Sequence, residues 1–227
     1  MKKDSNYLSI LGKSPLFKGI RDDEIEEMMG CLAGDLKKYR KDEYILRLGD
    51  SLEAIGLLIS GSVSVIKEDY WGNRNIMAKM EPGDIFGESY ACVPGAALGV
   101  SVEAATDSEV LFLNVGKIMT TCNSACSFHS KLSQNLLTIL ASKNLYLNSK
   151  LTHMMQRTTR EKLLSYLSGE SVKHNSASFD IPFNRQQLAD YLSVDRSAMS
   201  NELCKMRDEG ILKFDKNHFS LMADIDR

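Results

Sequence analysis

The sequence is poor in the residues that build metal centres and disulfide frameworks. It contains four histidines, and the stretch from residue 36 to residue 113 has none. Metal-dependent enzymes hold their metal with clustered histidines and carboxylates, so this stretch is not expected to be an enzyme. The five cysteines are an odd number without a CxxC pair, and no disulfide framework or metal cofactor is predicted.

Long hydrophobic runs are also missing. The first residues, MKKDSNYLSILGKS, hold too few consecutive apolar side chains for the core of a signal peptide. No other stretch approaches the length that a membrane span needs. We therefore expect a cytoplasmic protein without a membrane partner.

Neither sign of charge is in excess. The formal net charge is −2, and basic and acidic residues balance from residue 151 onward. Bulk charge therefore does not indicate a nucleic-acid partner, and DNA binding would depend on basic side chains placed on one face. The length of 227 residues and the 43% hydrophobic content predict ordinary globular structure, most simply as two domains.

Two short helices are predicted near the C-terminus, between Phe183 and Met206. Asn184 can cap the first helix, and Gln187 three residues later completes a capping box. After a short turn, Asp195 can cap the second helix, which Gly210 would end. Two capped helices separated by a turn of this length are typical of a helix-turn-helix.

The second of these helices, expected from Asp195 to Glu209, has one apolar and one polar face. Met199, Leu203 and Met206 repeat at helical spacing and predict the buried stripe. Side chains on the polar face can donate to phosphates or read base edges. The residues predicted to bind DNA are Arg185, Gln186, Arg196, Ser197, Ser200, Asn201 and Lys205.

A ribbon is predicted after this helix. Residues 211–221 alternate like a hairpin, with Asp215, Lys216 and Asn217 at the turn. A hairpin in this position would be the wing of a winged helix-turn-helix. The alternative is an ordinary helical hairpin packed by Leu and Met, without a DNA-binding role. Such a hairpin would need neither the capping residues nor the ribbon that follows.

The N-terminal half has strand-like periodicity. Short alternating runs fill residues 36–113 and are separated by turn signals such as Gly49-Asp50 and Pro82-Gly83. Many short strands at near-regular spacing predict an antiparallel β-roll, preceded by a short helix in residues 14–34. A loop and a short helix are expected to follow Gly87. With the helical C-terminal half, the fold class is α+β.

A long helix is predicted to join the two halves. Residues 124–155 contain neither Gly nor Pro. Two largely apolar stripes repeat at helical spacing. The stripe expected to contact a second subunit is Leu137, Leu140, Asn144, Leu147, Leu151 and Met154. The stripe expected to contact the roll is Leu132, Leu136, Ile139 and Tyr146. Residues 157–168 predict a further helix and residues 168–178 a loop. The predicted parts are residues 1–121 (effector-sensing roll), 122–150 (dimerisation helix) and 151–227 (DNA-binding domain).

The order of these pieces resembles the Crp/Fnr family of bacterial transcription regulators. The resemblance rests on GD at 49–50, ISGSVSV at 59–65, PGDIFGES at 82–89, the long helix and the terminal winged helix-turn-helix. It covers essentially the whole chain. It implies a homodimeric regulator that is not an enzyme, that senses a small-molecule effector and that binds a palindromic operator in double-stranded DNA. RNA polymerase is a further candidate partner.

The effector segment departs from the family's cyclic-nucleotide-binding members. Those members hold the cyclic phosphate with an Arg-Ser pair about ten residues after the Glu that Glu88 matches, where this chain has Ala96, Ala97, Leu98 and Gly99. A phosphate needs a cation or several donors, so the effector is not expected to be a cyclic nucleotide. A small apolar or aromatic effector, and no ligand at all, both stay open. The residues predicted to bind an effector are Gly87, Glu88, Ser89, Leu98, Gly99, Asn144 and Asn148.

The positions of the cysteines bear on three other sensing chemistries: an iron–sulfur centre, a haem and a redox switch. An iron–sulfur centre needs about four thiolates, and the first thirty residues contain no cysteine. Cys92 is the only axial ligand that the effector segment offers to a haem. Cys122 and Cys126 lie four positions apart and suit a redox switch, half of a metal site or core packing. Two further alternatives are a small-molecule-binding β-roll without a DNA role and a cyclic-nucleotide module that acts on a protein partner.

Overall fold

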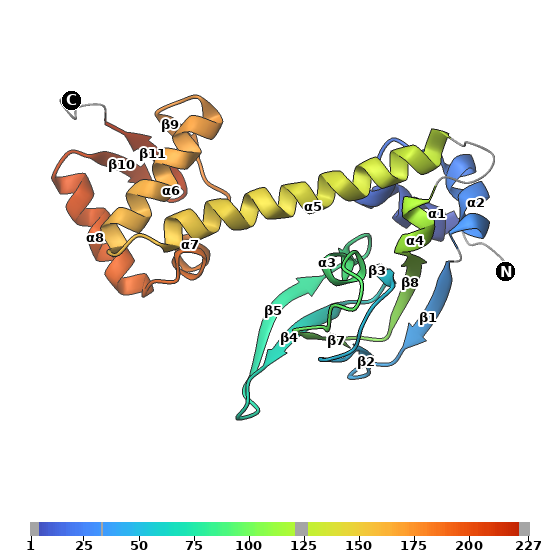
Figure 1. The fold of residues 1–227 in the computed structure, drawn as a ribbon. Helices are drawn as coiled ribbons and strands as arrows, with labels where there is room; N and C mark the ends of the chain where they lie inside the picture. The colour runs from blue at the N-terminus through green and yellow to red at the C-terminus, as the bar shows by residue number, and fades with distance from the viewer. Residues whose placement is uncertain (1–4, 33, 121–126, 223–227) are drawn as a thin grey trace. The chain divides into compact units, whose positions relative to one another are not determined.

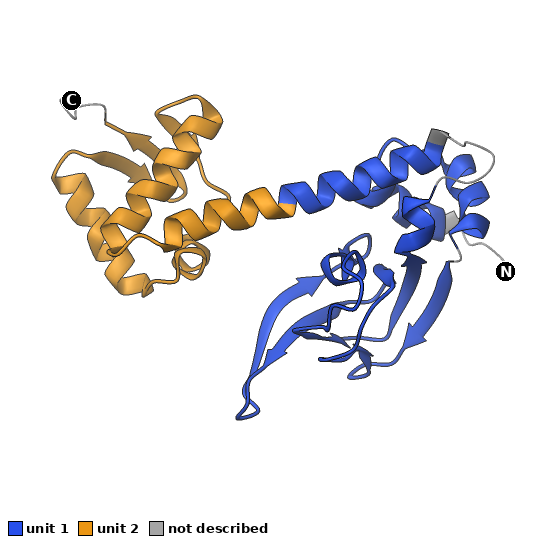
Figure 2. Cartoon of the chain, in the orientation of Figure 1, with its two compact units in different colours: residues 1–142 blue, residues 143–227 orange. Residues whose placement is uncertain are grey.

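The structure, a computed structural model, describes residues 5–32, 34–120 and 127–222. The chain divides into two compact units, residues 1–142 and residues 143–227 (Figure 2). The boundary falls inside the long helix α5 (Ser127–Met154), so residues of this one helix belong to both units. An antiparallel β-roll, a long helix and a C-terminal winged helix-turn-helix are all present (Figure 1), which confirms the predicted fold class.

The first unit begins with helices that pack on the roll. They are α1 (Ser5–Lys13), the short 3-10 helix η1 (Pro15–Phe17) and α2 (Asp22–Cys31). Three acidic residues occupy the first turn of α2, where the helix dipole favours negative charge. Ile25 and Met28 are buried, as the pattern predicted. Helix α1 was not predicted.

The roll consists of two four-stranded antiparallel sheets. The first has the order β1 (Asp35–Tyr39), β8 (Ser108–Asn114), β3 (Ala54–Ser60) and β6 (Ile85–Phe86). The second has the order β2 (Tyr44–Leu46), β7 (Ser101–Ala104), β4 (Val63–Glu68) and β5 (Arg74–Met80). These strands lie in the region predicted to be strand-like, residues 36–113, except that β1 begins one residue before it and β8 ends one residue after it.

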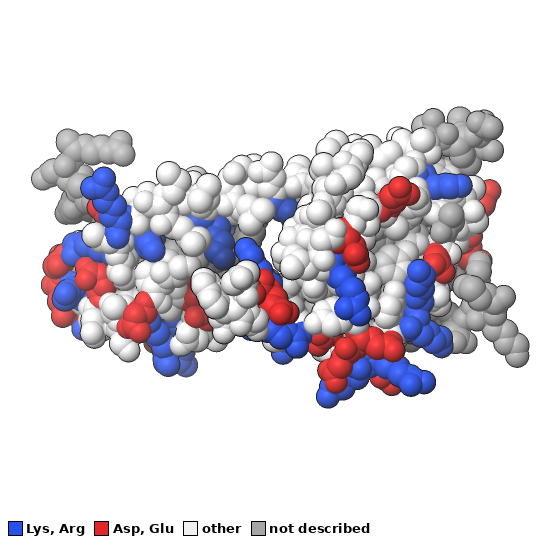
Figure 3. Space-filling view, turned by 60° about the horizontal axis from the view of Figure 1, so that its bottom comes forward, with Lys and Arg blue, Asp and Glu red and all other residues white. Residues whose placement is uncertain are grey.

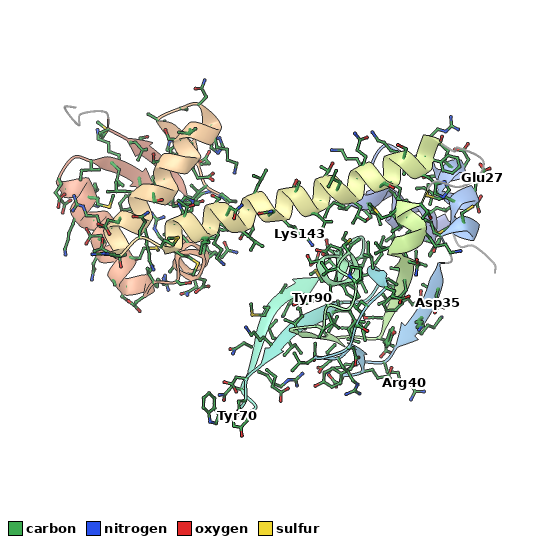
Figure 4. All side chains as sticks on the ribbon, viewed as in Figure 1. Glu27, Asp35, Arg40, Tyr70, Tyr90 and Lys143 are labelled. Carbon is green, nitrogen blue, oxygen red and sulfur yellow. The ribbon has the colours of Figure 1, made fainter. Side chains whose placement is uncertain are left out.

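The interior of the roll is closely packed by its own side chains. A Cβ added to Gly56 on β3 would lie 2.5 Å from the ring of Phe86, so only glycine leaves room for that ring. The same apolar cluster includes Leu58, Val102 and Val110. Tyr70, by contrast, stands at the tip of the β4–β5 hairpin, points away from it and is 95% exposed (Figure 4).

Two short helices flank the later strands of the roll. Helix α3 (Glu88–Ala91) follows β6, and α4 (Val115–Met119) follows β8, capped by the Asn114 side chain. The start of α5 packs on the hydrophobic core that the N-terminal helices form with strands β3 and β8, through Leu132, Leu136 and Ile139. The predicted second stripe is wrong at Tyr146, which lies in the second unit with its ring 6.1 Å from that of Tyr191.

Most of the other stripe of α5 is exposed in the single chain, but Leu140 was predicted wrongly, since it packs against the core of the first unit. Leu137, Leu147 and Leu151 are 67%, 60% and 56% exposed. A helix seldom leaves a row of leucines in water, since burying each one contributes about 1.5–3 kcal/mol. The exposed row follows the spacing that was predicted for a contact with a second subunit.

The second unit contains the C-terminal helices and a small sheet. After α5 come α6 (Thr159–His174), β9 (Ser178–Asp180), α7 (Arg185–Leu192), α8 (Arg196–Asp208), β10 (Leu212–Asp215) and β11 (His218–Leu221). The strands form one antiparallel sheet in the order β10-β11-β9. Strand β9 was not predicted.

Helix α6 is longer than predicted. Residues 168–174 are helical, and Asn175 ends the helix in the left-handed conformation. Gly169 lies inside the helix beside the ring of His153, where an added Cβ would be 3.5 Å from the ring carbon Cε1, an ordinary contact distance. The prediction of a loop was therefore wrong from Gly169 to His174, which belong to α6. None of the helices in the described ranges has the length and apolarity that crossing a membrane requires.

Candidate nucleic-acid interface and effector segment

Both helices of the helix-turn-helix begin at the predicted caps. The Asn184 side chain accepts a hydrogen bond from the Gln187 amide at 3.0 Å, and the Gln187 side chain accepts one from the Asn184 amide at 2.9 Å. The Asp195 carboxylate accepts one from the Ala198 amide at 2.7 Å. Each cap satisfies amides that a helix start leaves without partners, so the first turns of α7 and α8 are fixed locally.

The turn between the two helices is set by Ser193 and Val194. Ser193 adopts a left-handed conformation with φ of 51°, and the Val194 amide donates to the Ala189 carbonyl at 3.0 Å. The Lys162 ammonium on α6 donates to the Leu192 carbonyl at 3.2 Å. The C-terminal end of α7 is thus held by its own turn and by α6.

Helix α8 shows the two predicted faces. Met199, Leu203 and Met206 are fully buried in the core of the second unit. On the other side, Ser200 is partly buried, and four residues are exposed: Arg196, Ser197, Asn201 and Lys205. Basic and acidic side chains are interspersed on the surface in Figure 3. On the face that Figure 3 shows, basic side chains therefore do not form a continuous surface.

Arg160, at the start of α6, anchors α8. Its guanidinium lies 3.4 Å from the Glu202 carboxylate and donates to the Glu209 carboxylate through both terminal nitrogens. Glu202 also lies 3.7 Å from the ammonium of Lys205. The proximity of Arg160 lowers the pKa of the Glu209 carboxyl. These pairs neutralise acidic groups on the helix that carries the candidate base contacts.

The wing has the predicted form. Strands β10 and β11 pair from Leu212 opposite Leu221 to Asp215 opposite His218, which leaves Lys216 and Asn217 as the exposed turn. A cavity of about 420 Å³ lies between this turn and the first turn of α7. It is lined by Pro182, Phe183, Asn184, Arg185, Gln187, Lys216 and Asn217.

Arg185 differs from the other predicted DNA contacts. Its guanidinium carbon lies 4.9 Å from the ring centroid of Phe214 and 5.0 Å from that of Phe219, both in the wing. Burial lowers the pKa of this guanidinium. Arg185 therefore packs α7 onto the wing, and it also lines the cavity beside the wing turn. Gln186, next to it, is exposed and donates to the Asp190 carboxylate at 2.8 Å.

The predicted effector residues of the roll have mixed surroundings. Gly87 has φ of 77°, and a Cβ there would come within 3.0 Å of Leu52, so the position requires glycine. Glu88 is buried, whereas Ser89 is exposed. Tyr90, on α3 (Figure 4), brings its hydroxyl to 3.0 Å from where a Cβ of Gly99 would be.

The segment around Leu98 is tied to the turn after β2. The Leu98 amide donates to the Asp50 carbonyl at 2.8 Å, and the Gly49 amide donates to the Leu98 carbonyl at 2.9 Å. Ser51 and Ala97 form an additional β-bridge. The Leu98 side chain is buried in the roll core. This leaves Gly87, Ser89 and Gly99 as the predicted effector residues of the roll that are not buried.

The remaining predicted effector residues lie on α5 in the second unit. Asn148 donates to the Asn144 side chain at 2.8 Å, and both side chains are exposed. Their grouping with the roll residues stays a prediction, as does the redox role of Cys122 and Cys126, which lie outside the described residues. Within the described ranges, no three His, Cys, Asp or Glu side chains are close enough to share a metal ion.

Two family models match the chain. Residues 36–125 match the cyclic nucleotide-binding domain, and residues 158–226 match the Crp-like helix-turn-helix domain. The two matches cover the β-roll and the winged helix-turn-helix in the order seen in the structure. The chain belongs to the Crp/Fnr family.

One curated relative of this Crp/Fnr chain is a "Probable transcriptional activator" from Rhizobium leguminosarum bv. viciae. The two are 25% identical over 132 residues. The alignment covers 56% of this chain and 53% of the relative, so the chain spans about half the length of the curated relative that it matches.

Solved structures share the Crp/Fnr fold. The Thermus thermophilus catabolite activator protein is 21% identical, with a TM-score of 0.50 over 92% of this chain and 94% of that one. A CprK structure in complex with OCPA is 12% identical, with a TM-score of 0.56 over 86% of this chain and 89% of that one. At these identities the likeness concerns the fold alone.

Three residues near the interface of this Crp/Fnr chain were missed from the sequence. Lys216 and Asn217 were placed in the wing but not among the DNA contacts, although a polar turn beside a recognition helix is a signal for them. The role of Arg160 could not be predicted from local sequence, because the carboxylates that it contacts, Glu202 and Glu209, are 42 and 49 positions away.

Proposed function

We propose that this chain is a sequence-specific DNA-binding transcription regulator, with α8 as its recognition helix. The proposal rests mainly on the exposed polar face of α8. Arg196, Ser197 and Asn201 face solvent while the opposite face of this capped helix is buried. Arginine and asparagine side chains form the bidentate contacts that distinguish bases in a major groove. Gln186, Ser200 and Lys205 complete the proposed contacts, and Lys216 and Asn217 of the wing are placed to donate to phosphates.

We further propose that the regulator acts as a homodimer on a palindromic operator. The row of exposed leucines on α5 supports a second copy as the partner, because identical helices offer each other the same apolar stripe. Two α8 helices would then enter successive major grooves about 34 Å apart. RNA polymerase is the partner that a bound regulator would contact next.

Binding to the DNA upstream of the protein's own coding sequence tests the first proposal. Full-length protein should shift a labelled upstream fragment at constant salt, and an unlabelled copy should compete better than scrambled DNA of equal length. Equal competition by both DNAs would leave only the sequence-independent attraction of phosphates. That result would contradict a sequence-specific regulator.

We propose that the effector, if bound in the roll, is small and is not a cyclic nucleotide. The segment from Gly87 to Gly99 contains neither Lys nor Arg to pair with a cyclic phosphate. A cyclic nucleotide stays the second candidate because the roll matches the cyclic nucleotide-binding domain. Calorimetric titration with cyclic AMP and cyclic GMP decides between them, since micromolar binding of either would overturn the first choice.

A further inference from the structure

His153, near the C-terminal end of α5, is buried where three helices of the second unit meet. The residue is 7% exposed. It packs edge-on against Tyr166 of α6, with 5.7 Å between centroids, and lies 6.3 Å from Tyr191 of α7. A histidine in this place touches the helix that enters the domain, the helix that anchors α8 and the first helix of the helix-turn-helix.

Both ring nitrogens of His153 have hydroxyl partners, which come from different helices. Nδ1 lies 2.8 Å from the Ser165 hydroxyl on α6, and Nε2 lies 3.2 Å from the Ser149 hydroxyl on α5 itself. In a neutral ring one nitrogen donates and the other accepts, and a hydroxyl can serve either role. The two serines can therefore partner the ring in either charge state, and through it they join α5 to α6; what disfavours the charged ring is its burial.

The charged and titratable groups around the ring offer little to balance a positive charge. From α6, Glu170 is the carboxylate that faces it; its Oε1 already pairs with the Lys173 ammonium at 3.4 Å, and its Oε2 lies 3.6 Å from His174. Tyr166 of α6 is neutral. From α5 comes Lys150, a cation 5.4 Å from the Tyr191 ring centroid, together with Tyr146. From α7 comes the phenol of Tyr191. One side of the ring lies against Gly169, which contributes no side chain.

We propose that His153 is a positioning residue that holds the end of α5 on α6 and α7 only while its ring is neutral, so that acidification loosens the helix-turn-helix from α5 and weakens DNA binding. The inference rests on the DNA-binding function proposed above. It adds a regulation by pH that the effector site of the roll does not require.

The direction follows from the burial of the ring. Burial lowers the pKa of His153, and the attraction of Glu170 opposes this only in part. The packed arrangement thus keeps its full stability above the ordinary histidine pKa of about 6.5. Below that value, His153 in the unfolded chain binds a proton more readily than the packed ring does. The free energy of unfolding therefore decreases as pH falls through the lowered pKa. Protonation would also force both nitrogens to donate.

DNA affinity measured from pH 7.5 to pH 5.5 tests the inference in the full-length protein. The native protein should lose about fivefold or more in affinity, the lower end of usual coupling between sites. His153→Gln keeps a donor and an acceptor for the two serines but does not titrate, so its affinity should change clearly less. His129→Gln removes a histidine of the first unit, away from the groups around His153, and is the control that should keep the native profile.

A second readout does not depend on DNA. The thermal unfolding midpoint of the native protein should fall more between pH 7.5 and pH 5.5 than that of His153→Gln. Failure of the native protein to bind its upstream DNA at pH 7.5 would count against the proposed function, while the unfolding comparison would still judge His153. Equal pH dependence of native and His153→Gln proteins in affinity and in unfolding would overturn the inference.

Discussion

At the scale of single residues, Arg196 tests the proposed recognition surface most directly. It is the first residue of α8 and is exposed to solvent. Arg196→Ala is expected to cost about 1–3 kcal/mol in specific binding, because a bidentate contact to a base is lost. Fluorescence anisotropy at fixed salt measures this loss. Lys173→Ala removes the same charge from the far end of α6 and should leave specific affinity nearly unchanged; equal effects of the two variants would remove Arg196 from the interface.

Asn201 is predicted to set base preference. Many members of the family carry an arginine at this place, and the resemblance therefore implies an unusual half-site. Asparagine pairs with adenine through N6 and N7, whereas arginine pairs with guanine through O6 and N7. Asn201→Arg should change the selected base from adenine to guanine at one position of each half-site. Selection from randomised half-sites measures this, and an unaltered preference would mean that Asn201 reads no base.

Arg185 shows why a side chain's role is harder to predict than its element. Its position at the start of α7 is what the capping residues predict. Its guanidinium nevertheless packs on Phe214 and Phe219, which lie about thirty residues later in the wing. Local spacing contains no information about those rings, so the predicted DNA contact of Arg185 is the least supported of the set.

At the scale of elements, the cap of α8 is expected to matter for stability. Asp195→Ala removes the carboxylate that accepts the Ala198 amide and should cost about 1 kcal/mol, within a range of roughly 0.5–2 kcal/mol. The thermal midpoint should fall by about 2–4 °C for a chain of this size. Asp190→Ala, which removes an exposed carboxylate bonded only to the Gln186 side chain among the described contacts, should change it little. A midpoint that responds equally to both changes would mean that the cap contributes nothing special.

Elements whose signals are local were predicted well, and those that depend on packing were not. The starts of α7 and α8 follow from Asn184 and Asp195, each bonded three positions away. Helix α6 continues through Gly169, which packs beside the His153 ring of α5. Strand β9 exists because it pairs with β11, about forty positions later. Neither the His153 ring beside Gly169 nor the strand that pairs with β9 can be recognised from the local sequence.

At the scale of the whole molecule, the leucine row of α5 is predicted to hold two chains together. Replacing both Leu147 and Leu151 by lysine places like charges in the seam and should convert the dimer to monomers. Operator affinity should fall as well, because two half-sites are no longer engaged together. Sedimentation equilibrium gives the mass and anisotropy gives the affinity.

Ser142→Lys is the control for this prediction. Ser142 is exposed on the side of α5 opposite the leucine row, so a lysine there should leave the mass unchanged. If the double variant stays dimeric while Ser142→Lys does not, the subunits pair through the other side of the helix. Monomeric native protein would contradict the dimer altogether.

The sequence by itself determined the order of elements, the antiparallel roll, the long helix, the caps and the two faces of α8. These depend on residue type and on spacing over a few positions, which a chain displays before it folds. Only the tertiary structure decided that Arg185 packs on the wing, that Arg160 holds α8 through Glu202 and Glu209, and that His153 lies buried between serines of two helices. Those roles depend on partners brought close by packing of distant segments, and local sequence does not encode the distances between them.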